Sequence, residues 1–165
     1  MRAVSFLVVL LWFCTGCTER SEAGPKPGET FPQLALTSLA GGESVDLSEY
    51  RGKAVLLNFW ATWCEPCRRE MPALEALAVQ EKRVAVIGVS VDGDVNLARE
   101  FVLKHRLTFA RYADPGMAST RPVLATQALP VTYLISADGR LLARYLGARD
   151  WNAAEIRREV EAALR

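Results

Sequence analysis

Residues 54–80 of the sequence, AVLLNFWATWCEPCRREMPALEALAVQ, contain the strongest structural signals in the chain. The first seven, residues 54–60, form a near-continuous apolar run, which is typical of a strand buried on both faces of a sheet. From Pro66 to Gln80 the apolar residues recur at helical spacing, and we expect Pro72 within this pattern to kink the helix. The stretch therefore predicts a central strand that leads directly into a helix.

Two cysteines, Cys64 and Cys67, lie at the junction of this strand and helix. The N-terminus of a helix carries unpaired N–H groups and a positive partial charge, which stabilise a thiolate at Cys64. Cys67 follows one turn later, close enough to resolve a mixed disulfide. The pattern predicts a redox-active pair with Cys64 as nucleophile and Cys67 as resolving thiol. The alternative is a structural disulfide or a pair of buried free thiols.

Other kinds of cysteine chemistry fit these residues less well. Attachment of a c-type haem needs a histidine after the second cysteine, and Arg68 stands there. A zinc site needs a second pair of ligands, but the chain has a single histidine, His105, and its other cysteines lie near the N-terminus. A peroxidatic cysteine needs Pro and Thr at set offsets before it, where Leu57 and Ala61 stand. We therefore expect neither a metal nor a cofactor.

The rest of the sequence predicts a mixed sheet. The expected elements, in order, are a hairpin over 31–47, the strand over 54–60, the helix over 66–80, a second buried strand over 84–91, a helix capped by Asp94, a short strand over 108–112, a hairpin over 131–145 and a last helix capped by Asp150. A strand–helix–strand order implies a parallel pair with a right-handed crossover, and the closing hairpin adds an antiparallel edge. We expect an α/β fold with helices on both faces of the sheet.

Composition limits the chain to one domain without a nucleic-acid partner. The 165 residues are 50% hydrophobic and 24% charged, which suits a single globular core. Lys and Arg number 20 against 19 Asp and Glu. This balance lacks the basic excess of a nucleic-acid binder. We expect the folded domain to span residues 31–165.

The N-terminus has the features of an export signal. After Arg2, residues 3–13 are almost wholly apolar, but as a helix they span only about 17 Å of a hydrocarbon core of about 30 Å. The sequence CTGC that ends at Cys17 resembles the bacterial lipobox, in which the signal, here residues 1–16, is removed and the cysteine is lipidated. Cleavage without lipid and an uncleaved anchor are the alternatives. Each places the domain outside the cytoplasm, after a flexible tether over 17–30.

The motif NFWATWCEPCRREMP, residues 58–72, resembles the active site of TlpA/ResA-type thiol–disulfide oxidoreductases, a thioredoxin-fold family with AhpC/TSA-like relatives. The similarity extends from about residue 31 to residue 164. It implies a thioredoxin fold with an additional N-terminal hairpin. It also implies that Pro130 is cis and faces the cysteine pair, and that the backbone before it, at Leu129, docks the substrate.

The resemblance also implies an acid, Glu70, near the buried cysteine. Cytoplasmic thioredoxins carry an Asp at the position of Asn58, and Asn cannot accept a proton. We therefore expect Glu70 to assist proton transfer at Cys67. The alternative is a surface glutamate paired with a neighbouring arginine. Trp63, directly before the nucleophile, is expected to contribute to the substrate-binding surface.

These features together predict an exported, membrane-tethered thiol–disulfide oxidoreductase on the periplasmic face of a bacterial membrane. We expect it to reduce protein disulfides, because the charge of Glu65 opposes the Cys64 thiolate from a shorter distance than Arg68 and Arg69 favour it. A membrane electron donor of the DsbD/CcdA type would then re-reduce the protein. The alternatives are a dedicated reductant of apocytochrome c in cytochrome c maturation, and a non-catalytic binding module of the same fold.

Overall fold

The computed structural model describes residues 24–42, 44–126 and 128–164. The predicted signal peptide over 1–16, Cys17 and the first part of the tether lie outside the described residues. None of the helices in the described part of the chain is long and apolar enough to cross a membrane.

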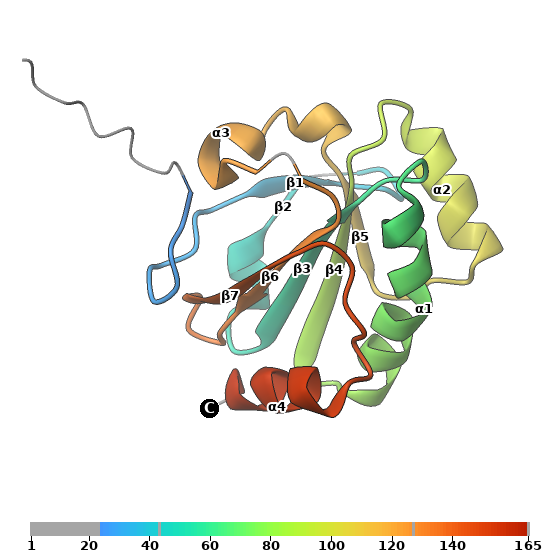
Figure 1. The fold of residues 1–165 in the computed structure, drawn as a ribbon. Coiled ribbons are helices and arrows are strands. Elements are labelled where there is room, and N and C mark those ends of the chain that lie inside the picture. The colour runs from blue at the N-terminus through green and yellow to red at the C-terminus, as the bar shows by residue number, and fades with distance from the viewer. Residues whose placement is uncertain (1–23, 43, 127, 165) are drawn as a thin grey trace, which may run out of the picture.

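A seven-stranded mixed sheet forms the centre of the structure (Figure 1). Across the sheet its strands are, in order, β2 (Ser44–Asp46), β1 (Ala35–Ser38), β5 (Ala110–Ala113), β4 (Val84–Ser90), β3 (Ala54–Trp60), β6 (Val131–Ile135) and β7 (Leu141–Leu146). The three strands β3, β4 and β5 are parallel, and the β1–β2 and β6–β7 hairpins join them through antiparallel pairings. The predicted mixed sheet and the additional N-terminal hairpin are confirmed.

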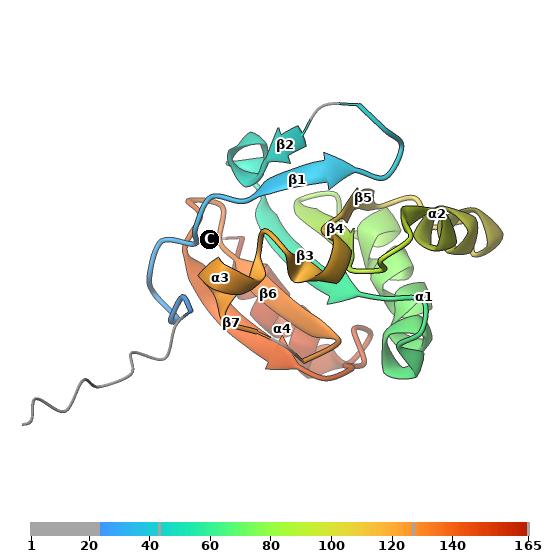
Figure 2. The same cartoon turned by 90° about the horizontal axis from the view of Figure 1, so that it is seen from above.

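Three longer helices cover one face of this sheet. They are α1 (Glu65–Gln80), α2 (Val95–Lys104) and α4 (Ala154–Ala162). Asn58 of β3 contacts α1, and Trp60, two residues along and therefore on the same face, packs against Phe101 of α2 with ring centroids 5.1 Å apart. Tyr145 of β7 donates a hydrogen bond to Glu159 of α4. Seen from above, these helices lie on one side of the sheet (Figure 2).

The opposite face is covered by shorter elements. The short helix α3 (Arg121–Leu124) lies there, as Figure 2 shows, within a segment whose sequence has no regular pattern. The ring of Phe31 packs edge-on against Tyr133 of β6, with centroids 5.3 Å apart. Two 3₁₀ turns, η1 (Leu47–Tyr50) and η2 (Pro115–Met117), complete the described elements. The sheet therefore has helices on both faces, as predicted.

The core is continuous across the middle of the sheet. Every residue of β3 is buried, as its apolar sequence predicts for a central strand. In the neighbouring β4, Gly88 lies beside Asn58. A Cβ atom at this position would lie 2.7 Å from the ring of Phe109 and 3.3 Å from Trp60, so the packed aromatic side chains leave no space for a larger residue.

The residues before β1 are fixed to the domain. The N–H of Gly28 donates to the carbonyl of Leu141 at 2.7 Å, and the N–H of Phe31 donates to Gly139 at 2.9 Å. Thr30 forms an isolated bridge with Arg140. The segment that was expected to be a flexible tether as far as residue 30 is thus hydrogen-bonded to the β6–β7 turn from Gly28 onward.

One of the two predicted helix caps differs from the structure. Asp94 caps α2 as expected, because its side chain accepts the N–H of Asn96 at 2.9 Å. Asp150 does not cap α4. Its carboxylate accepts the N–H of Asn152 in the preceding turn, and the helix starts at Ala154 without a side-chain cap. Aspartate is favoured in both settings, so local sequence did not distinguish a turn from a cap.

Candidate active site

The cysteine pair lies where β3 leads into α1. Cys64 is the N-cap residue of α1, and its Sγ accepts the N–H of Cys67 at 3.3 Å. The two residues form a disulfide with an S–S distance of 2.05 Å. Cys67 is fully buried, whereas Cys64 keeps 6% of its surface exposed. The burial is consistent with the predicted roles, because an incoming substrate can reach Cys64 before Cys67.

The expected substrate-binding residues lie at the end of the sheet that carries the cysteine pair. Trp63 is 69% exposed, which is unusual for a residue of this size in a packed domain. The Leu129–Pro130 peptide bond is cis, as the resemblance implies. Because Val131 pairs with Phe59 near the end of β3, Pro130 lies at the same end of the sheet as the cysteine loop.

A buried carboxylate holds the loop that carries Trp63 and Cys64. Asp92, which is 1% exposed, accepts the backbone N–H of Thr62 at 3.1 Å and its hydroxyl at 2.7 Å. Ser90, the last residue of β4, donates its hydroxyl to the same carboxylate at 2.8 Å. Asp92 stands in a loop-like stretch of the sequence, where an aspartate most often serves turn chemistry. The structure shows that this side chain fixes the loop to the neighbouring strand.

Glu70 lies on the buried face of α1, one turn after Cys67. Only 3% of its surface is exposed, and its carboxylate accepts three hydrogen bonds. Asn58 Nδ2 donates to Oε1 at 2.7 Å, and the backbone N–H of Arg149 and the indole N–H of Trp151 each donate to Oε2 at 3.1 Å. A solvated surface glutamate paired with an arginine, the alternative considered from the sequence, is therefore wrong.

The surroundings of Glu70 favour a carboxyl that takes up protons more readily than usual. Burial raises the pKa of Glu70 above its ordinary value, and the hydrogen bonds from Arg149, Asn58 and Trp151 lower it by a smaller amount. Glu70 also lines a surface hollow together with Arg69 and Asp150. This hollow is where solvent comes nearest to the buried carboxyl in the part of the chain that the structure describes.

The charge inside the CxxC motif, on Glu65, is compensated by the two arginines that follow the motif. Glu65 forms an ion pair with Arg68, and its other oxygen lies 3.8 Å from the guanidinium of Arg69. The argument from the sequence, in which Glu65 acts on the Cys64 thiolate as the dominant charge, does not hold in this arrangement. The three side chains are about half exposed or more, so solvent screens what remains of their field.

Several residues of this site were not found from the sequence. Thr132, Arg149 and Trp151 contact Glu70 or its partner Asn58 from positions more than sixty residues away in the chain. Arg149 contributes only its backbone N–H, for which no sequence signal exists. Trp151 did offer a weak signal, because an indole in a polar loop requires a hydrogen-bond acceptor when it is buried.

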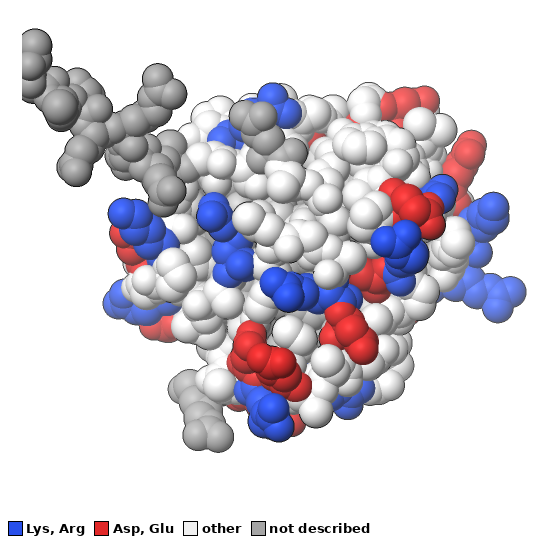
Figure 3. Space-filling model, in the orientation of Figure 1, with Lys and Arg blue, Asp and Glu red and all other residues white. Residues whose placement is uncertain are grey.

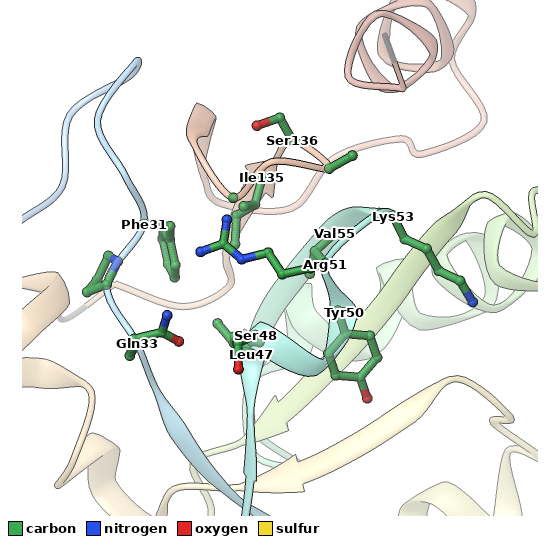
Figure 4. Close-up of a pocket in the computed structure, with 13 residues that line it drawn as sticks. Phe31, Gln33, Leu47, Ser48, Tyr50, Arg51, Lys53, Val55, Ile135 and Ser136 are labelled. Carbon is green, nitrogen blue, oxygen red and sulfur yellow. The ribbon is translucent and has the colours of Figure 1, made fainter.

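The molecule has a further pocket, at the other end of β3. Phe31, Leu47 and Ile135 are among the residues that line it, and the Arg51 side chain extends across it to the β6–β7 turn (Figure 4). No cysteine is among its lining residues. Figure 3 shows acidic and basic side chains interspersed over one face of the molecule, with neither sign dominating. Within the described residues, the cysteines lie at the opposite end of the sheet from this pocket.

Comparison with known proteins agrees with this site. Residues 27–144 match the model of the AhpC/TSA family. The chain is 33% identical over 125 residues to the thiol-disulfide oxidoreductase ResA of Bacillus cereus, which covers 73% of this chain and 69% of the relative. It is 37% identical over 125 residues to the thioredoxin-like protein YneN of Bacillus subtilis, which covers 73% of this chain and 71% of that protein.

Solved structures show the same fold. A protein from Chlorobium tepidum, assigned as a thiol:disulfide interchange protein DsbE, superposes with a TM-score of 0.78 at 27% identity, covering 86% of this chain and all of the other. A secreted disulfide oxidoreductase of Mycobacterium tuberculosis gives a TM-score of 0.68 at 26% identity, with 79% of this chain and 96% of the other covered. With the Cys64–Cys67 pair at the end of its central strand, the chain belongs to the AhpC/TSA family and, within it, to the thiol–disulfide oxidoreductases of the ResA type.

Proposed function

We propose that this oxidoreductase reduces disulfides of protein substrates outside the cytoplasm, while a lipid on Cys17 holds it at a membrane. The observation that carries the proposal is the division of the site into two layers. Cys64 keeps a small exposed surface next to the exposed Trp63, and Cys67 and Glu70 are more deeply buried on one face of α1. Such a site meets a protein substrate through one sulfur and keeps the second sulfur and the proposed proton acceptor behind it.

The first step of the proposed reaction forms a mixed disulfide. The Cys64 thiolate, stabilised by the N-terminus of α1, attacks one sulfur of the substrate disulfide. A bond forms between Cys64 Sγ and that sulfur, and the substrate S–S bond breaks. The second substrate sulfur leaves with the electron pair as a thiolate and takes a proton from solvent.

The second step releases the substrate. Cys67 gives its proton to the Glu70 carboxylate, and the resulting thiolate attacks Cys64 Sγ. The Cys64–Cys67 bond forms, and the first substrate sulfur leaves as a thiolate that takes up a proton. Glu70 then returns its proton to solvent through the hollow that it lines with Arg69 and Asp150. In total the substrate gains two electrons and two protons, and the protein dithiol becomes the disulfide seen in the structure.

A protein that works in this direction needs a source of electrons. We propose a dithiol protein in the membrane of the DsbD/CcdA type, because the lipid anchor would keep the domain at the membrane surface. The donor attacks the Cys64–Cys67 disulfide, and the two steps above then run in reverse. Apocytochrome c, with its cysteine pair, is one substrate that such an enzyme could reduce at this location.

The reduction potential tests the direction of transfer. We expect equilibration with glutathione buffers, read by the alkylated fraction of Cys64, to give a potential closer to the value of about −270 mV typical of thioredoxin than to the value of about −120 mV of a strong oxidant. The ion pairs of Glu65 with Arg68 and Arg69 leave the cysteines without a strong local charge to favour the thiolate. A potential near −120 mV would contradict the reductant assignment.

The anchor has a separate test. Mass spectrometry of the membrane fraction is expected to show an acyl-modified chain that begins at Cys17, because the residues before it resemble a lipobox. A Cys17→Ser chain should leave the membrane fraction or retain its signal, while its purified domain keeps full disulfide-exchange activity. An unmodified wild-type chain that starts at another residue would rule out the lipid anchor and leave the reductase proposal intact.

A further inference from the structure

We infer that Asn58 and Thr132 form a reversible hydrogen-bond pair that follows the charge of Glu70. Asn58 donates to Glu70 and to Thr132 when Glu70 is ionised. After rotation of its amide, Asn58 accepts from both when Glu70 is protonated. The inference rests on the proposed function of Glu70 as the acceptor of the Cys67 proton. It assigns to Asn58 a positioning role, in which this side chain acts on the cysteines only through Glu70.

The observed contacts are those of an ionised Glu70. Asn58 uses both of its side-chain N–H groups, one toward Glu70 Oε1 at 2.7 Å and one toward Thr132 Oγ1 at 2.9 Å. Its side-chain oxygen Oδ1 is buried and finds no hydrogen-bond donor among the residues that the structure describes. A buried acceptor without a partner is rare and costly, so its position beside a titrating group requires an explanation.

A proton that reaches Glu70 has only one suitable oxygen. Oε2 faces the backbone N–H of Arg149 and the indole N–H of Trp151, and neither group can accept a hydrogen bond. Oε1 faces Asn58, whose amide contains both a donor and an acceptor. The proton is therefore best placed on Oε1, provided that Asn58 turns its oxygen toward it.

Rotation of the Asn58 amide about its Cβ–Cγ bond makes this possible. The oxygen and NH₂ ends of an amide are nearly equal in size, so the rotation needs little repacking of the surrounding core. Oδ1 then accepts from the protonated Oε1 of Glu70. It also accepts from the hydroxyl of Thr132, which can serve as donor as well as acceptor. Each orientation has two hydrogen bonds and leaves one end of the amide unpaired, so the two are of similar energy.

The other polar groups around Glu70 do not reverse in this way. On α1 these are the Cys67 sulfur, one turn before it, and Arg69, which lines the hollow. The loop between β7 and α4 contributes Arg149 and Asp150 to the hollow, in addition to the two fixed N–H donors. The strands β3 and β6 contribute Asn58 and Thr132, which carry no charge. Of these groups, only Asn58 and Thr132 can exchange donor for acceptor when a proton arrives on Glu70.

The consequence is a carboxyl that can change charge inside the core without losing a hydrogen bond. A residue that only accepts, such as Asp at position 58, would favour the protonated form of Glu70. A fixed donor would favour the ionised form. Asn58 serves both forms, so Glu70 can take a proton from Cys67 and release it again at similar cost in each direction.

The pKa of Glu70 in two variants of similar design tests this inference. It is read by ¹³C NMR of labelled glutamate carboxyls in the oxidised full chain. Trp151→Phe removes a donor that serves only the ionised form, so we expect the pKa of Glu70 to rise by about one pH unit. Asn58→Leu also replaces a buried polar group with an apolar one, but removes a partner from both forms. Its pKa rise should be less than half as large. An equal or larger rise would show that Asn58 is a fixed donor and overturn the inference.

A second measurement uses the wild-type chain and does not depend on the folding of a variant. As the pH falls through the pKa of Glu70, we expect the nuclear Overhauser effects between the Asn58 NH₂ hydrogens and the Thr132 side chain to weaken several-fold. Unchanged effects across the titration would overturn the inference. Neither readout involves turnover. Unaltered activity of a Glu70→Gln chain would contradict the proposed role of Glu70 as proton acceptor. It would not bear on whether the Asn58 amide rotates.

Discussion

A Cys64→Ser chain is expected to lose protein-disulfide reduction by a factor on the order of a thousand or more, which corresponds to about 4 kcal/mol of activation free energy. Serine at the N-cap of α1 preserves the fold, because its hydroxyl can accept the N–H of Cys67 as the Cys64 sulfur does in the disulfide form. It provides no sulfur for the mixed disulfide. The measurement is insulin reduction with a small thiol as electron donor.

The Cys67→Ser chain is the matched control for this result. It also loses turnover, but it retains Cys64 and should accumulate a covalent complex with the substrate that Cys64→Ser cannot form. Gel analysis under non-reducing conditions separates the two variants, and the captured proteins identify the physiological substrates. A covalent complex formed through Cys67 in the Cys64→Ser chain would show that the roles of the two cysteines are reversed.

Replacement of Glu70 by Gln is expected to lower turnover at neutral pH by about a hundredfold, the typical contribution of a positioned acid or base. Gln has a similar volume, and its one side-chain oxygen can still accept the N–H groups of Arg149 and Trp151. Its NH₂ group takes the place of the oxygen that faces Asn58 and donates to the oxygen of a rotated Asn58 amide, but it cannot take the Cys67 proton. The pH dependence of the second step should flatten as well. Stopped-flow measurement of mixed-disulfide resolution over a pH series gives both quantities.

The stability of the same variant provides an independent readout. Burial raises the pKa of Glu70 above its ordinary value of 4.5, so between 4.5 and the raised pKa the folded protein binds more protons than the unfolded chain. The free energy of unfolding of the wild-type protein therefore falls as the pH rises through this window, and the Gln variant should lack this decrease. Glu75→Gln, on the same helix, serves as control. If turnover and its pH profile are unchanged in Glu70→Gln, Glu70 is a structural residue only.

The central part of the fold could be predicted because its signals are local. The apolar run of β3 and the helical spacing of α1 lie next to each other in sequence, and the cysteines stand between them. The Asp138–Gly139 turn likewise determines the β6–β7 hairpin through residues that are adjacent in the chain. Local propensity and the final structure agree in these elements. The sequence alone therefore placed Cys64 and Cys67 at the junction of β3 and α1.

The environment of Glu70 could not be predicted in the same way. The contacts of this side chain come from α1, β3 and the loop before α4, and no periodicity in the sequence relates these segments. The same holds for Asp92, whose hydrogen bonds to Thr62 depend on how two parallel strands end side by side. The sequence shows that these residues carry a carboxylate. The tertiary packing decides which N–H and O–H groups donate to it.

The attachment of the N-terminal segment determines where the domain bears a mechanical load. If the chain is held at Cys17, any pull on the domain enters through Gly28 and Phe31, whose hydrogen bonds to the β6–β7 turn are stretched first. Strand β6 runs antiparallel to β3, so this turn lies at the end of the sheet remote from the cysteines. Tension on the tether therefore acts away from Cys64, and we expect the domain to exchange disulfides at the same rate whether its tether is slack or taut.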